Sequence, residues 1–330
     1  MIATVGLLVK NAAPYLPEIL SAVLSQRLEA EFEVLAVDSG STDATLQILA
    51  RCPVRVIRIP PEAFNHGETR NLVAREAHFS SQFVVYLSQD ALPRDDQWLS
   101  NLLSPFAEDP SVAGVFSRHI PRPGASPSLV RQLTTQWQTG GEHRLVKQMP
   151  DSIAEYEANK DYYIYFSNTS SALRREVWRS IPFSPVGFAE DADWADRALR
   201  AGHKVVFEPK SVVVHSHDYS IIEQFRQNVD HTNAMIALFD PPTYHDHSLW
   251  WRALLRCPRE VWRDWRFLRT SPYHEGTRPW AKLRWALRSP AWHLASVVGG
   301  WAGANLERIP KPWRVRLGRQ ERLKRGTESD

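Results

Sequence analysis

Cysteine is scarce in this 330-residue chain, which contains only Cys52 and Cys257. The two cysteines lie far apart and form no CxxC spacing, so they argue against a disulfide framework and against a thiolate zinc site. Long hydrophobic runs are missing as well. No stretch of eighteen apolar residues occurs, and the best candidate, residues 291–304, is interrupted by a histidine, a serine and glycines. We therefore expect no transmembrane helix.

A secretory leader is also missing from the sequence pattern. The chain begins with an apolar run at residues 2–9 that no basic segment precedes, so we expect a strand here and a cytoplasmic protein. Hydrophobic residues make up 43% of the chain and charged residues 23%, which is ordinary for a globular protein. A chain of this length has room for one large domain and an appendage.

Positive charge and tryptophan are concentrated towards the C-terminus. Residues 251–330 carry 18 Lys or Arg and 7 Asp or Glu, a net charge of +11, which leaves −8 for residues 1–250 of the total of +3. Nine of the thirteen tryptophans lie at or after Trp250. Between residues 252 and 266 arginines recur every three or four positions, which predicts a helix with one basic face beside Trp262 and Trp265.

A basic helix with tryptophans fits an anionic membrane surface, where each well-placed cation contributes roughly 1 kcal/mol. The alternative is that these helices only pack on the rest of the protein, with their arginines in solvent. We expect no nucleic-acid partner.

Apolar segments alternate with helical patterns in the first hundred residues. The apolar segments are residues 2–9, 32–37, 54–59 and 83–87, and the helical patterns are residues 15–26, 44–50 and 68–78. Continuous apolar strands separated by helices predict an α/β fold with a mostly parallel sheet that helices cover on both faces. We assign residues 1–235 to this domain and residues 236–330 to a C-terminal helical extension.

Polar residues follow the predicted strands at their carboxyl ends, where such sheets bind ligands. They are Lys10 and Asn11, residues 38–41, and residues 88–90. Asp90 directly follows a buried strand, and a divalent cation prefers carboxylate ligands. Its neighbour Gln89 cannot supply a second negative charge, so another ligand is needed.

His215 and His217 are candidates for that further ligand. They lie two residues apart at the end of a strand, where alternation points them to opposite faces, so we expect one of them to reach the metal. Surface or capping histidines are the alternative.

Glu190 and Asp191 begin a predicted helix. We assign Asp191 as a general base, because a positioned carboxylate that takes a proton from a hydroxyl is typically worth about 10² to 10⁴ in rate. The alternative is a capping role, since carboxylates are stabilised at a helix N-terminus. In residues 64–71, Gly67 permits close approach of a backbone and Arg70 can pair with phosphate oxygens.

Five short strings follow one another along the chain: VDSGSTD at 37–43, FNHGETRN at 64–71, SQDALP at 88–93, FAEDADW at 188–194 and HSHDYS at 215–220. In this order they resemble the family 2 glycosyltransferases of the GT-A fold over roughly residues 2–235, and within them the bacterial rhamnosyltransferases. The resemblance implies a Rossmann-like, mostly parallel sheet. It also implies inverting transfer of L-rhamnose from dTDP-β-L-rhamnose to a glycan hydroxyl in surface polysaccharide synthesis.

The resemblance further implies an acceptor glycan linked to a polyprenyl diphosphate and a protein at the inner face of the plasma membrane. Mg²⁺ or Mn²⁺ is the implied cofactor. Asp38, Ser39 and Ser41 would hold the base and ribose of the donor. Asp90 would keep the metal carboxylate of an Asp-x-Asp pattern, and Asp191 would be the catalytic base.

The candidate site residues fall into three groups by their expected contacts. Those for the nucleotide sugar are Lys10, Asn11, Asp38, Ser39, Ser41, His66, Gly67, Arg70, Gln89 and Asp90; those for the acceptor or for support are Asn168, Glu190 and Trp194; those for the metal are Asp90, His215 and His217.

Other functions remain compatible with these residues. The donor can be another nucleotide sugar, linked to UDP or GDP. A sugar nucleotidyltransferase needs a Gly-rich phosphate loop near the N-terminus, and residues 9–12 contain no glycine. A non-catalytic nucleotide-binding scaffold at the membrane is the third alternative.

Overall fold

The computed structural model describes residues 2–135, 141–239 and 249–318. The chain divides into two compact units, residues 1–122 with 133–216, and residues 123–132 with 217–330. The second unit therefore includes residues 217–235, which the sequence pattern assigns to the sheet domain.

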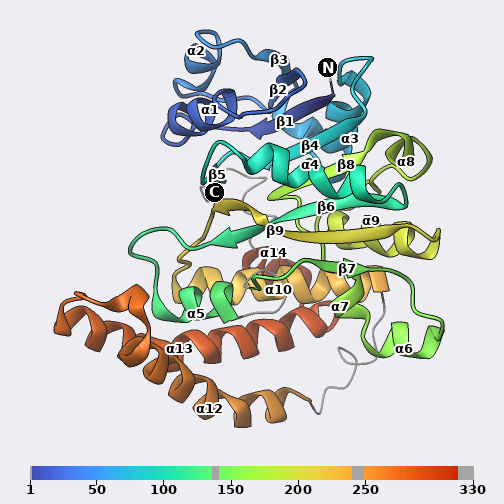
Figure 1. The fold of residues 1–330 in the computed structure, drawn as a ribbon. Helices are drawn as coiled ribbons and strands as arrows, with labels where there is room; N and C mark the ends of the chain where they lie inside the picture. The colour runs from blue at the N-terminus through green and yellow to red at the C-terminus, as the bar shows by residue number, and fades with distance from the viewer. Residues whose placement is uncertain (1, 136–140, 240–248, 319–330) are drawn as a thin grey trace. The chain divides into compact units, whose positions relative to one another are not determined.

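The first unit is built on one mixed sheet, whose strands are labelled in Figure 1. Its described strands are β1 (Ala3–Val9), β2 (Phe32–Asp38), β3 (Arg55–Arg58), β4 (Phe83–Ser88), β5 (Leu92–Pro93), β6 (Val112–Ile120), β7 (Leu145–Lys147), β8 (Ser170–Arg174) and β9 (Lys204–Val214). Their order is β3-β2-β1-β4-β8-β6-β9-β5, with β7 also paired to β9. Strands β3, β2, β1 and β4 are parallel, whereas β8 runs antiparallel between β4 and β6. The predicted α/β fold is confirmed.

Helices connect and flank these strands. Those whose residues lie wholly in the first unit are α1 (Leu16–Leu24), α2 (Thr45–Leu49), η1 (Pro61–Ala63), α3 (His66–Glu76), α4 (Trp98–Glu108), α6 (Ile153–Ala158), α7 (Lys160–Ile164), α8 (Arg175–Ser180) and α9 (Glu190–Arg200). The helix α5 (Pro127–Thr135) begins among the residues of the second unit and ends among those of the first.

The core of the first unit follows from the apolar strands. Side chains of β1, β2 and β4 are almost entirely buried, as is typical of strands covered on both faces. Full burial of each large aliphatic side chain contributes about 1.5 to 3 kcal/mol. Gly6 lets α3 pack closely on β1, because a Cβ at this position would lie 2.3 Å from Val73.

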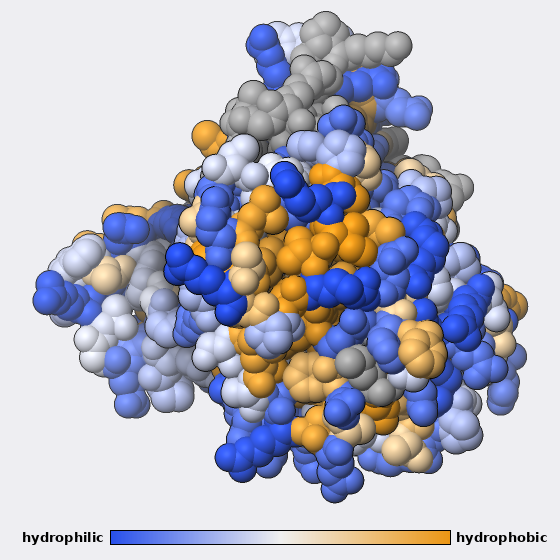
Figure 2. All heavy atoms as spheres, turned by 90° about the horizontal axis from the view of Figure 1, so that it is seen from above, coloured by the Kyte–Doolittle hydropathy of each residue, from blue (hydrophilic) through white to orange (hydrophobic). Residues whose placement is uncertain are grey.

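Some hydrophobic residues in α1, in α2 and in and next to β3 stay partly exposed. Leu24, Leu46, Ile48, Val54 and Val56 pack against the core without being fully buried. Figure 2 shows the face seen from above in Figure 1, where hydrophobic residues gather between hydrophilic ones.

The second unit is helical. Its helices are α10 (Ile221–Phe239), α12 (Leu249–Thr270), η2 (Pro272–His274), α13 (Pro279–Ala304), η3 (Leu306–Arg308) and α14 (Lys311–Leu317), so the predicted C-terminal helices are present. Glycines explain why α10 belongs with them. A Cβ on Gly299 of α13 would lie 2.3 Å from the backbone oxygen of Phe225 in α10, and one on Gly303 would lie 2.5 Å from that of Val229. The two backbones therefore approach more closely than larger residues allow.

A buried carboxylate of the second unit joins α12 to α13 and to the first part of α5. Asp264 of α12 accepts hydrogen bonds from Ser128 and Arg131 of α5, and from Ser289 of α13, at 2.5 to 2.7 Å. His293 lies 2.9 Å from the same carboxylate. These groups satisfy a charge that would otherwise be costly to bury.

Among the described helices, none is both long and apolar enough to cross a lipid bilayer.

Candidate active site

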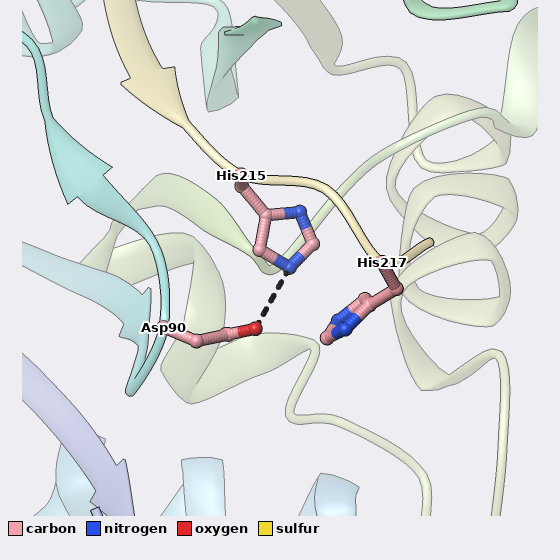
Figure 3. A group of neighbouring side chains, drawn as sticks. All are labelled: Asp90, His215 and His217. Carbon is pink, nitrogen blue, oxygen red and sulfur yellow. Dashed lines mark ion pairs between the residues drawn. The ribbon is translucent and has the colours of Figure 1, made fainter. Parts of the chain in front are cut away.

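Three side chains that can bind a metal converge at the ends of β4 and β9. Asp90 lies two residues after β4, and its Oδ2 is 3.4 Å from Nε2 of His215, the residue that follows β9. Asp90, His215 and His217 each offer one ligand atom, and these atoms all lie within 4.8 Å of one another. Figure 3 shows the three side chains converging. Alternation along a strand predicts that only one histidine reaches this position. Because β9 ends at Val214, alternation does not apply to either histidine.

The chemistry of this group fits a divalent cation, since carboxylate and imidazole are both common metal ligands. His119 of β6, which sequence analysis missed because it lies in no recognisable motif, packs its ring against His215 with ring centroids 5.6 Å apart. Burial lowers the pKa of His119 to about 3, so the ring is neutral. Its Nε2 is buried and has no hydrogen-bond partner among the described residues. Buried polar atoms normally have a partner, so this nitrogen fits a place beside a metal-binding group that a bound ligand completes.

The loops after β1, β2 and β4 are tied together by hydrogen bonds. The backbone N–H of Lys10 donates to Oε1 of Gln89 at 2.8 Å, and that of Asn11 donates to Oγ of Ser41 at 2.9 Å. The buried side chain of Asp38 accepts from the backbone of Ser41 at 3.3 Å. The structure thus brings together the predicted nucleotide-binding residues in the loops after β1, β2 and β4. Gln89 connects the loop after β4 to the loop after β1.

Ser39 also lies in this group. It is buried, and its backbone N–H donates to the oxygen of Val9 at the end of β1 at 3.0 Å. Asn11 has a φ of +50°, a conformation that asparagine tolerates better than most residues.

The acidic pair Glu190 and Asp191 begins α9. The residue before them, Ala189, has a φ of +61° and a ψ of +30°, a left-handed conformation that an alanine rarely adopts. This conformation turns the chain immediately before the pair. Asp191 is partly buried, and its Oδ1 accepts from the backbone N–H of Ala192 at 2.9 Å.

The two carboxyl groups have different proton affinities. Burial, and then the negative charge of Glu190, raise the pKa of Asp191 to about 7. Burial alone would also raise the pKa of Glu190, but the charges of Arg70 and His66 and a hydrogen bond from Asn168 outweigh it and lower that pKa. Glu190 therefore stays ionised, while Asp191 can gain or lose a proton near neutral pH.

Asn168 connects the acidic pair to the end of β4. Its backbone N–H donates to Oδ2 of Asp191 at 3.4 Å, and its side chain donates to Glu190 at 3.1 Å. The adjacent Thr169 accepts through its backbone oxygen from the N–H of Ser88, two residues before Asp90, at 2.9 Å. One short segment thus links the acidic pair and the strand that ends at the metal-binding group.

Other predicted residues lie further from these groups or serve packing. Trp194 is fully buried, donates from Nε1 to the oxygen of Ile181 at 2.9 Å, and packs on Gly114, where a Cβ would lie 2.7 Å from its ring. Gly67 permits close approach of a backbone, since a Cβ here would lie 2.1 Å from the oxygen of Ser184.

Sequence analysis missed the contacts of two asparagines within the string FNHGETRN. Asn65 caps α3 by accepting from the N–H groups of Gly67 and Glu68 at 3.0 Å. The side chain of Asn71 binds both the N–H and the oxygen of Phe183. An asparagine before a predicted helix is a recognisable N-cap signal, whereas the contact of Asn71 is too distant along the sequence to predict.

Comparison with known proteins identifies related sequences. The family model of Glycosyl transferase family 2 matches residues 4–176. The O-antigen chain rhamnosyltransferase RfbN of Salmonella typhimurium (strain LT2) is 29% identical over 243 residues, which are 73% of this chain and 71% of that protein. The O-antigen chain rhamnosyltransferase WbaN of Salmonella anatum is 32% identical over 200 residues, 60% of this chain and 61% of that protein.

Solved structures share the fold. The mannosyltransferase PcManGT from Pyrobaculum calidifontis, in complex with GDP-Man and Mn²⁺, has a TM-score of 0.53 and 21% identity and covers 98% of this chain and 85% of its own. The S. aureus TarS 1-349 structure has a TM-score of 0.53 and 16% identity, with 93% and 91% covered. At these identities the similarity concerns the fold alone.

Proposed function

Because the chain belongs to glycosyl transferase family 2, we propose that it transfers L-rhamnose from dTDP-β-L-rhamnose, with inversion, to a glycan hydroxyl in bacterial surface polysaccharide synthesis. The observation that carries the proposal is the link through residues 168 and 169 between Asp191 and the strand that ends at the metal-binding group. It supports a single site in which Asp191 acts as the base and the end of β4 binds the diphosphate. The similarity to two rhamnosyltransferases supports rhamnose as the sugar.

Asp191 has the properties that a base for this reaction needs. It must be ionised to accept the proton of the acceptor hydroxyl, and a pKa of about 7 matches its proton affinity to neutral conditions. The hydroxyl oxygen then attacks the anomeric carbon, and the bond from that carbon to the diphosphate breaks. Partial burial excludes part of the water that would compete with the acceptor.

Asp90, His215 and His217 would hold a divalent cation. Such an ion offsets the negative charge on a departing diphosphate. The carboxylate suits either of the two implied ions, Mg²⁺ or Mn²⁺, and the two imidazoles favour Mn²⁺ over Mg²⁺, which takes oxygen ligands in proteins.

The acceptor is proposed to be a glycan on a polyprenyl diphosphate at the inner face of the plasma membrane. Two helices carry the supporting observation. Exposed apolar side chains recur along one side of α12 and one side of α13: Trp251, Leu255, Trp262 and Trp265, and Trp280, Leu283, Leu287, Leu294, Val298 and Trp301. On α12 the exposed Arg256, Arg259 and Arg266 flank that row. Aromatic and aliphatic groups beside arginines fit an anionic lipid surface.

Replacement of Asp191 by Asn tests the base. We expect release of dTDP from dTDP-β-L-rhamnose with Mn²⁺ to be lost, while dTDP binding stays near that of the unchanged protein. The matched control is Asp193→Asn on the same helix, because Asp193 pairs with Arg197 at 2.8 Å and has no proposed role in the reaction. Normal turnover in Asp191→Asn would contradict the assignment.

Replacement of Asp90 by Asn tests the metal site, and thermal stability provides the readout. Ligand at 100 times its dissociation constant adds about 2.7 kcal/mol to the unfolding free energy. We expect dTDP with Mn²⁺ to stabilise the protein and the Asp90→Asn variant to lose this effect. Stabilisation by UDP or GDP instead would change the sugar and keep the transferase, while no response to any nucleotide would contradict the proposed donor site.

A further inference from the structure

The guanidinium group of Arg70 forms an ion pair in the protein interior. It lies in α3, its Nη1 is 2.9 Å from Oε1 of Glu190 in α9, and the two side chains are only 9% and 8% exposed. The same nitrogen donates to the backbone oxygen of His66 at 3.1 Å. Because the ion pair is shielded from water, its charges interact more strongly than those of a surface pair.

Glu190 connects this ion pair to the proposed base. Asn168 donates to Oε1 of Glu190, the same oxygen that faces Arg70, and it also donates from its backbone to Asp191. Ser171 of β8 fixes Asn168 by donating to its Oδ1 at 2.8 Å. Groups from α3, β8 and α9 therefore hold Asp191 in one network.

A phosphate group that paired with the charge of Arg70 through Nη1 would compete with Glu190. Separating a buried ion pair so that one charge stays unpaired is strongly unfavourable. Of the other guanidinium nitrogens, Nε is buried and has no hydrogen-bond partner among the described residues.

We propose that Arg70 is a positioning residue for Asp191, which it holds through Glu190 and keeps ready to accept a proton, and that other groups bind the diphosphate. The inference rests on the proposed role of Asp191 as the base. It replaces the expectation from the sequence that Arg70 pairs with phosphate oxygens.

Glu190 and Arg70 act on Asp191 in opposite directions. After the effect of burial, the charge of Glu190 raises the pKa of Asp191 and the charge of Arg70 lowers it. When Glu190 is neutralised, the positive charge of Arg70 remains and lowers the pKa of Asp191. When Arg70 is removed, the negative charge of Glu190 remains and raises that pKa. A neighbouring charge moves a pKa by about 1 to 3 units, so the two changes shift the protonation of Asp191 in opposite directions.

The test compares Glu190→Gln, Arg70→Met and Arg70→Lys. Release of dTDP from dTDP-β-L-rhamnose with Mn²⁺ is measured across the pH range in which Asp191 titrates. We expect the acidic limb of the profile to move by roughly one pH unit or more, to lower pH in Glu190→Gln and to higher pH in Arg70→Met. Arg70→Lys keeps the charge, so its acidic limb should stay close to that of the unchanged protein.

Binding of dTDP, measured by calorimetry, separates this role from a contact with phosphate. We expect its dissociation constant in Arg70→Met to change by less than about threefold. A loss of about tenfold or more with an unmoved acidic limb would assign Arg70 to the diphosphate and overturn the proposal. Limbs that move in the same direction in Glu190→Gln and Arg70→Met would overturn it as well.

Two further measurements apply if a variant does not fold or if the protein does not use the proposed donor. If Arg70→Met does not fold, the double variant Arg70→Met/Glu190→Gln removes both charges, and its limb should lie between those expected for the single changes. If the unchanged protein releases no dTDP, the proposed donor is wrong. The unfolding free energy measured against pH then tests the inference without a substrate. The stability of the unchanged protein depends on pH between the unfolded and folded pKa values of Asp191. Glu190→Gln should narrow this pH range, and Arg70→Lys should preserve it.

Discussion

Asp191 illustrates how a side chain can be useful for chemistry and unfavourable for folding. Its pKa is about 7 in the folded protein, because burial and Glu190 disfavour the charged form, whereas a free aspartate has a value of 3.8. Between these two values the folded state binds a proton that the unfolded state has lost. Folding stability must therefore fall as pH rises through this range.

Replacing Asp191 by Asn should remove this dependence. We expect the variant to match the unchanged protein near pH 4 and to be more stable at pH 7 and above, because Asn cannot ionise. Urea unfolding at a series of pH values measures the effect. Equal stability of the two proteins at pH 8 would show that Asp191 is not held in an unfavourable charged form.

Sequence analysis located most candidate residues but not their partners. The predicted membership of family 2 and the GT-A fold are confirmed by the family model and the structural neighbours. The strings place Asp90 and Asp191 by residue type and spacing alone. The ion pair of Arg70 with Glu190 joins residues 120 positions apart, and no periodicity records such a contact. His119 was missed for the same reason, since one histidine in a strand carries no pattern.

The packing of α13 on α10 depends on glycine at particular positions. Gly299→Ala should lower the unfolding free energy by about 1 to 3 kcal/mol, because its Cβ would lie 2.3 Å from a backbone oxygen that cannot move without separating the helices. Urea denaturation provides the measurement.

The neighbouring Gly300 is a matched control. Its Cβ would meet only Oγ1 of Thr232, at 3.5 Å, and alanine is favoured over glycine in a helix by about 1 kcal/mol. We expect Gly300→Ala to be neutral or stabilising. Equal destabilisation by both changes would mean that close helix packing is not what Gly299 provides.

Asp264 should contribute to stability in a pH-dependent way. Burial raises its pKa, but hydrogen bonds from His293, Ser128 and Ser289 outweigh burial and hold it at about 2, below the value of 3.8 for a free aspartate. The stabilisation is thus present above pH 3.8 and is lost as pH falls towards 2.

Asp264→Asn should lower the unfolding free energy at pH 7 by about 2 to 3 kcal/mol. Asp218→Asn is the control, since Asp218 forms only a 3.6 Å pair with Arg288 and is 37% exposed, and pairs of this kind contribute at most about 1 kcal/mol. Chemical denaturation of both variants checks the difference. A loss no larger than that of the control would contradict a stabilising role for Asp264.

Helix positions were easier to predict than helix partners. The helical patterns at residues 15–26, 44–50 and 68–78 correspond to α1, α2 and α3, with ends that differ by a few residues. The sequence assigns residues 217–235 to the sheet domain, since the family resemblance extends over roughly residues 2–235. The close approach at Gly299 and Gly303 helps to explain their place in the second unit, and glycine in a long helix does not reveal which helix it faces.

The exposed rows on α12 and α13 lead to a prediction for the intact protein. Leu283→Ser with Leu287→Ser should reduce sedimentation with vesicles that contain anionic lipid, because both side chains are more than 60% exposed and lie one helical turn apart. Phe79→Ser, in the first unit, is the control, since Phe79 is 85% exposed and belongs to neither exposed row. Unchanged sedimentation of the double variant, or an equal loss in the control, would refute membrane binding through α13.

The buried group around Asp264 also bears on the order in which the molecule can fold during synthesis. Arg131 and Asp264 are 133 residues apart, so at roughly 5 to 20 residues per second the ribosome adds the carboxylate about 7 to 27 s after the arginine. The last strand of the sheet, β9, is complete before α12 has been made. The sheet can therefore assemble on the ribosome while the first half of α5 still waits for its helical partners.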